Sequence, residues 1–140
     1  MDVGKNIKRI LSEQAEMLRK NQVNVQELYN LGTIMLAMAY ITGENYYYVL
    51  SNAFYTFSDT LTPFLKLVSM PLSIEFRQQT ERLLDELKRK VPRILDTISE
   101  AIGTDKCKAM EAAAELLMIS DRLNNVTENL KNLVVISTQE

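Results

Sequence analysis

The chain has 140 residues, of which 46% are hydrophobic and 24% charged, and its formal net charge is −2. A chain of this length is expected to form one domain, residues 1–140, with its own core, and its near-neutral charge gives no basic field that would favour nucleic acid. It contains no histidine and one cysteine, which excludes His-dependent nucleophile pairs, most zinc sites and any disulfide within the chain.

The first two predicted helices have clear sequence signals. Residues 3–20 carry apolar side chains at helical spacing, which predicts an amphipathic helix with one face to bury. The second helix begins after Asn24, whose side chain can accept a hydrogen bond from a free backbone N–H, and Glu27 stands at the reciprocal capping position. This helix is expected to end near Thr42, because Gly43 easily adopts the left-handed conformation that follows a helix.

Residues 28–57 are the most apolar part of the chain. They hold all six tyrosines, and only one of these residues, Glu44, is charged. Between Leu31 and Ile41 the apolar residues surround the predicted helix, which is typical of a helix at the centre of a core or in a membrane. The run is too short to span a bilayer. We therefore predict a central helical hairpin, with a third helix over residues 45–60, that the other helices cover.

Prolines divide the next part of the chain. Residues 62–72 contain two of them and are predicted to form a corner with at most two helical turns. A longer helix is predicted over residues 73–102. Pro92 lies inside this helix, where it removes a backbone hydrogen bond and clashes with the preceding turn, so a kink or break is expected at residues 88–91.

The last predicted helix, residues 105–136, has the longest regular pattern in the chain. Its apolar positions alternate spacings of three and four from Ala109 to Leu133, a heptad pattern that is typical of nearly parallel helix packing. With the preceding helix it is expected to form a long C-terminal hairpin. The sequence therefore predicts an all-α fold, a mostly antiparallel bundle of four to six helices.

Aromatic and polar residues at helical spacing are the leading candidates for a ligand site or an interface. They lie on the second and third predicted helices and are Tyr29, Tyr40, Tyr48, Asn52, Tyr55 and Asp59. Spacing places each helix's members near one face. Hydroxyl groups on apolar walls are used by protein interfaces and small-ligand pockets, and the rim of a core has the same pattern.

Charged residues give weaker signals. A basic cluster comprises Lys88, Arg89, Lys90 and Arg93. Acidic residues precede and interleave with it, which is typical of a solvated helix face, although the cluster could attract an acidic partner. Glu111 and Glu115 lie one helical turn apart and could contribute to a Mg²⁺ site, but this spacing also fits an exposed face. Cys107 lies between two lysines and has no second cysteine or histidine to react with.

These patterns favour a cytoplasmic, non-enzymatic interaction or assembly protein. The long heptad pattern exceeds what a small monomer needs, so we expect a homodimer formed through the last helix and the tyrosines of the third. No cofactor, nucleic-acid partner or membrane span is expected. One alternative is a small-molecule or lipid-binding bundle with an apolar pocket walled by Tyr29, Tyr40, Tyr48 and Tyr55. The other is a Mg²⁺-dependent enzyme that acts on nucleotides through carboxylates.

Overall fold

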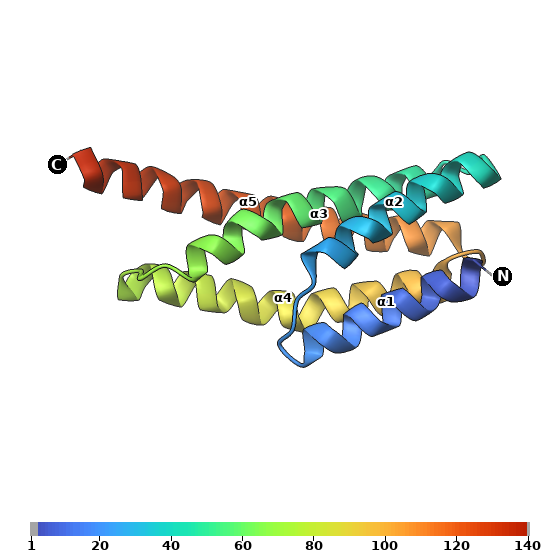
Figure 1. Ribbon diagram of the computed structural model, residues 1–140, viewed down its shortest axis with the longest axis horizontal. Coiled ribbons are helices and arrows are strands. Elements are labelled where there is room, and N and C mark those ends of the chain that lie inside the picture. Colours follow the sequence, from blue (N-terminus) through green and yellow to red (C-terminus); the bar gives the residue numbers. More distant parts are fainter. Residues whose placement is uncertain (1–2, 140) are drawn as a thin grey trace.

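The computed structural model describes the backbone of residues 3–139 and the side chains of residues 4–132. Within this range the chain forms five α-helices and no strand, which confirms the predicted all-α bundle (Figure 1). The helices are α1 (Val3–Arg19), α2 (Val25–Thr42), α3 (Tyr46–Val68), α4 (Ile74–Ala101) and α5 (Lys106–Gln139). Successive helices run in opposite directions, so α3 and α5 run the same way.

Helix α3 organises one side of the bundle. It packs against α2 and against α5, while α1 packs against α4 on the other side. Helices α4 and α5 also contact each other and join the two sides, as Figure 1 shows. The predicted C-terminal hairpin is therefore present, and α1 and α3 pack on it. Helix α2 packs mainly on α3 and only lightly on α1.

The prediction that both helices of the 28–57 hairpin lie at the centre of the core is right for α3 and wrong for α2. In α3, Phe54 and Phe57 are completely buried. In α2, the side chains of Tyr40 and Ile41 are 76% and 74% exposed. Because α2 has one principal neighbour, part of its apolar circumference stays uncovered.

The predicted caps of α2 at Asn24 and Gly43 are confirmed, whereas the reciprocal contact of Glu27 stays a prediction. The Asn24 side chain accepts a hydrogen bond from the backbone N–H of Glu27, at 3.1 Å. At the other end Gly43 adopts a left-handed conformation with φ of 71°, and its N–H donates to the carbonyl of Ala39. These contacts satisfy backbone groups that the helix itself leaves unpaired, so they fix where α2 begins and ends.

Neither internal proline ends its helix, so the corner predicted over residues 62–72 is wrong for residues 62–68, and the break considered at residues 88–91 does not occur. Helix α3 continues through Pro63 to Val68, and α4 continues through Pro92 to Ala101. An internal proline costs about 3 kcal/mol. Apolar residues buried at helical spacing continue past each proline, and keeping them buried offsets this cost: Leu61, Phe64 and Leu67 in α3, and Leu87, Val91, Ile94 and Ile98 in α4.

The heptad pattern of α5 is used within the chain. Six of its predicted apolar positions are buried in the bundle: Ala109, Ala112, Leu116, Ile119, Leu123 and Leu130. Val126 is partly buried against the same core. The side chain of Leu133 lies outside the described residues. Since these positions already pack on the other helices, the α5 pattern does not require a second chain.

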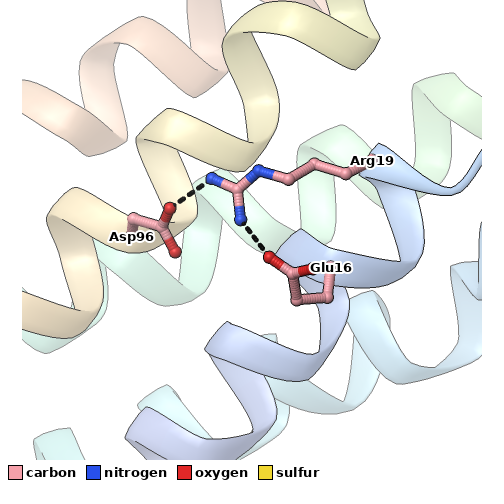
Figure 2. Close-up of polar contacts among 3 residues, drawn as sticks. All are labelled: Glu16, Arg19 and Asp96. Atoms are coloured by element: carbon pink, nitrogen blue, oxygen red, sulfur yellow. Dashed lines mark hydrogen bonds and ion pairs between the residues drawn. The ribbon is translucent and has the colours of Figure 1, made fainter.

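An ion-pair group connects the end of α1 to the C-terminal part of α4. Figure 2 shows the Arg19 guanidinium between two carboxylates, with one nitrogen 2.7 Å from Glu16 and another 2.5 Å from Asp96. Hydrogen bonds to Asp96 and then Glu16 raise the pKa of Arg19 above its ordinary value. Because these side chains are well exposed, the group contributes little to stability and mainly fixes how α1 lies on α4.

Candidate functional site

The six candidate residues on α2 and α3 lie along the outer junction of these two helices, which we call the tyrosine face: Tyr29, Tyr40, Tyr48, Asn52, Tyr55 and Asp59. The helices approach closely at Gly32. A Cβ atom added there would be 2.8 Å from the Tyr55 ring, so the glycine makes room for this side chain. The Ser51 hydroxyl donates a 2.7 Å hydrogen bond to the Gly32 carbonyl, which also draws α3 toward α2.

The tyrosines form two pairs across the α2–α3 junction. The ring centres of Tyr29 and Tyr55 are 4.7 Å apart with planes tilted by 51°, and those of Tyr40 and Tyr48 are 6.1 Å apart and nearly perpendicular. The Tyr55 hydroxyl shares a 2.7 Å hydrogen bond with the Thr33 hydroxyl. These are favourable arrangements for aromatic rings. The rings therefore pack on each other across the junction of the two helices, and Tyr40, at 76% exposed, lies on its outer side.

The outer side of this face is exposed and almost without charge. Tyr40 is 76% exposed, Tyr29 and Tyr48 are 43% and 41% exposed, and Ile41, the next residue of α2 after Tyr40, is 74% exposed. Between Tyr29 and Ser58 the sequence has one charged residue, Glu44, whose carboxylate lies 3.3 Å from the Lys106 ammonium of α5. Asn52 and Asp59 are also exposed, and Asp59 is the one charged residue among the six that define the tyrosine face. Exposed aromatic surface that lacks charge is characteristic of protein interfaces.

Two other tyrosines stabilise the start of α3. Tyr46 and Tyr47 are buried with ring centres 4.2 Å apart, and the Tyr46 hydroxyl accepts a hydrogen bond from the N–H of Gly103. Burial, followed by the hydrogen bond with Tyr46, raises the pKa of Tyr47 above its ordinary value. This contact joins α3 to the turn between α4 and α5, so these tyrosines have a structural role.

The basic cluster is only partly brought together. Lys90 and Arg93 line a groove between α4 and α5, whereas Lys88 and Arg89 lie outside its lining. The groove has a cavity volume of about 330 Å³, and its remaining lining residues are Glu86 and Ile94 of α4 and Glu115, Met118, Ile119 and Arg122 of α5. Sequence reasoning missed this groove. The signal was the helical spacing of Glu86, Lys90 and Arg93 on one predicted helix and of Glu115, Met118 and Arg122 on the next.

One carboxylate connects the two walls of this groove. Glu86 pairs with Arg122 of α5 and, at 2.7 Å, with Lys90 of its own helix. Hydrogen bonds from Arg122 and then Lys90 lower the pKa of Glu86 to about 2. Its side chain is 13% exposed, so this is the most enclosed ion pair in the described part of the chain.

The remaining sequence candidates lie on the surface. Glu111, Glu115 and Cys107 are exposed on α5. Among the side chains that the structure describes, no three acidic or cysteine residues gather in a way that could hold a metal ion. Over the same part of the chain, no helix combines the length and the apolar character needed to cross a bilayer.

Comparisons with protein-family models, with curated proteins and with solved structures find no match to this chain. The class that its own fold defines is an all-α bundle with an exposed, nearly uncharged tyrosine face on α2 and α3.

Proposed function

We propose that this protein is a non-enzymatic interaction protein that forms a homodimer through its tyrosine face. The observation that carries the proposal is the exposure of Tyr40 and Ile41, at 76% and 74%, on a helix that has one principal packing partner. Two large side chains at adjacent positions on the outer face of a helix are costly to leave in water, and covering them provides a driving force for association.

A second copy of the chain is the partner that this surface fits best. A two-fold dimer needs a surface that is complementary to itself, and an almost uncharged surface can meet its own copy without like-charge repulsion. Packing one α2–α3 pair on another would form four helices around a new apolar contact. Helix α5 is left out of this interface, because its heptad positions from Ala109 to Leu130 are buried or, at Val126, partly buried in the bundle.

Multi-angle light scattering on purified protein at micromolar concentration tests this proposal. We expect a species of twice the 16.0 kDa chain mass for the native sequence, and a single-chain species for a variant with Tyr40→Ser and Ile41→Ser. The matched control carries Met70→Ser and Ile74→Ser, because these residues are 48% and 72% exposed at the distant α3–α4 corner, and it should remain a dimer. A single-chain mass for the native protein at all micromolar concentrations measured would refute the proposal.

The same proposal includes a reducing, cytoplasmic setting. It is supported by the single cysteine, Cys107, which leaves no disulfide to form within the chain. The alternative of a tyrosine-lined ligand pocket has less support, because the rings pack in pairs, Tyr29 on Tyr55 and Tyr40 on Tyr48. Mass spectrometry of the native protein would detect a retained ligand.

A further inference from the structure

The groove between α4 and α5 lies away from the tyrosine face and plays no part in the proposed dimer. Its floor is apolar, because Ile94 and Ile119 are 3% and 5% exposed, and Met118 projects at its rim with 67% of its side chain exposed. A flexible methionine over an apolar floor is a common feature of surfaces that accept helices of different shapes.

The charges around this floor are unequal. Lys90, Arg93 and Arg122 contribute three positive charges to the lining, against the two carboxylates of Glu86 and Glu115. Glu86 is paired with both Arg122 and Lys90, so these three side chains together keep one positive charge, and the lining as a whole also carries one net positive charge. Arg93 makes no ion pair with any residue that the structure describes, and its guanidinium is free to meet an incoming acid.

The other two residues of the basic cluster lie outside the groove. Lys88 and Arg89 are on the same helix but not in the lining, and helical spacing turns Lys88 to the opposite side of α4. The local positive charge therefore comes from Lys90, Arg93 and Arg122. Positive side chains around an apolar groove raise the local concentration of acidic partners and reject basic ones.

We propose that the α4–α5 groove binds an acidic amphipathic helix of a partner protein, which seats an apolar side chain on Ile94 and Ile119 and an acidic side chain against Arg93. The shape supports a helix, because the lining residues recur at helical spacing along two antiparallel walls. A helix laid in such a groove presents anchors at the matching spacing. The side chains of Lys90 and Arg122 are 51% and 52% exposed, so a small carboxylate held between them would keep much of its surface in water.

Fluorescence anisotropy with a labelled synthetic peptide tests this assignment. The probe is a helix of roughly 18 residues, long enough to be partly helical in water, with leucines along one face and glutamates on both flanks. A second peptide has lysine in place of every glutamate. We expect the glutamate peptide to bind the native protein and the lysine peptide to bind at least about tenfold more weakly.

Two variants with matched controls locate the binding site. Arg93→Glu should weaken binding of the glutamate peptide about fivefold or more, because it replaces one attractive contact by a repulsive one. Arg89→Glu makes the same change in charge outside the groove and should alter binding less than about twofold. Met118→Glu should also weaken binding, whereas Met110→Glu, outside the lining of the groove on the same helix, should not.

Circular dichroism melts establish that each variant is folded before binding is compared. Equal binding of the two peptides, or equal losses for Arg93→Glu and Arg89→Glu, would overturn the proposal. Absence of peptide binding would also overturn it. Decanoate is tested as a small amphipathic carboxylate, and binding of decanoate without binding of the peptide would assign the groove to such small molecules. None of these results depends on the dimer, because the light-scattering variants alter a different surface.

Discussion

Replacing Glu86 with glutamine is expected to weaken the contact between α4 and α5 in a way that depends on pH. In the folded protein the Glu86 carboxylate accepts hydrogen bonds from Arg122 and Lys90, and these lower its pKa from 4.5 to about 2. Glutamine keeps the size and one acceptor oxygen but removes the charge. The ionised carboxylate therefore stabilises the folded state, and the neutral amide does not.

The expected magnitude follows from the pKa difference and from the exposure of the partners. At 1.36 kcal/mol per pKa unit, the difference between the Glu86 pKa in the unfolded and in the folded chain sets a ceiling of about 3 kcal/mol on the stability that its charge contributes at neutral pH. The side chains of Arg122 and Lys90 are 52% and 51% exposed, so solvent screens both charges. We therefore expect Glu86→Gln to lower the free energy of unfolding by roughly 1–2 kcal/mol at pH 7.

The pH dependence distinguishes charge loss from a packing defect. Because the folded pKa is depressed, the stabilisation is complete above about pH 5 and disappears as the pH falls from 4.5 toward 2. Urea unfolding of both proteins at several pH values should show the difference shrinking to a small fraction of its neutral value near pH 2. Glu13→Gln is the matched control, since its exposed pair with Arg9 should contribute less than about 0.5 kcal/mol. An equal loss at every pH would refute this reasoning.

Two further substitutions test the geometry of α2. Gly32→Ala should destabilise the protein by about 1–2 kcal/mol in urea unfolding, because the new Cβ would lie 2.8 Å from the Tyr55 ring. In a protein that already carries Tyr55→Ala, the same substitution should leave the free energy of unfolding unchanged or raise it, because alanine favours the helix more than glycine does. Persistence of the full loss in that background would show that Tyr55 is not the cause. Asn24→Ala should cost about 1 kcal/mol, because it removes the side chain that accepts from the Glu27 N–H, whereas Asn24→Asp should retain most of the stability.

The sequence by itself determined the helical class and several helix ends. Asn24 and Gly43 define the ends of α2 through groups only a few residues away, so their effect does not depend on the rest of the fold. The heptad spacing of α5 likewise identifies its inner side without a partner helix being known. These features depend on residues close together in the chain, so they can be predicted from the sequence alone.

Helix continuity at Pro63 and Pro92 was decided by tertiary packing. The local cost of each proline predicts a break, and the apolar residues buried on both sides of it oppose that break. Which of these two effects is larger depends on the neighbouring helices, and a sequence does not state how much surface they cover.

The two candidate surfaces show the same division. The spacing of the tyrosines identified one face of α2 and one of α3, but only the tertiary structure paired Tyr29 with Tyr55 and left Tyr40 and Ile41 exposed. The groove required α4 and α5 to lie antiparallel, with Glu86 beside Arg122, 36 residues away in the chain. Periodicity states which side of a helix is apolar, whereas the neighbour that covers that side, or its absence, is set by contacts between distant segments.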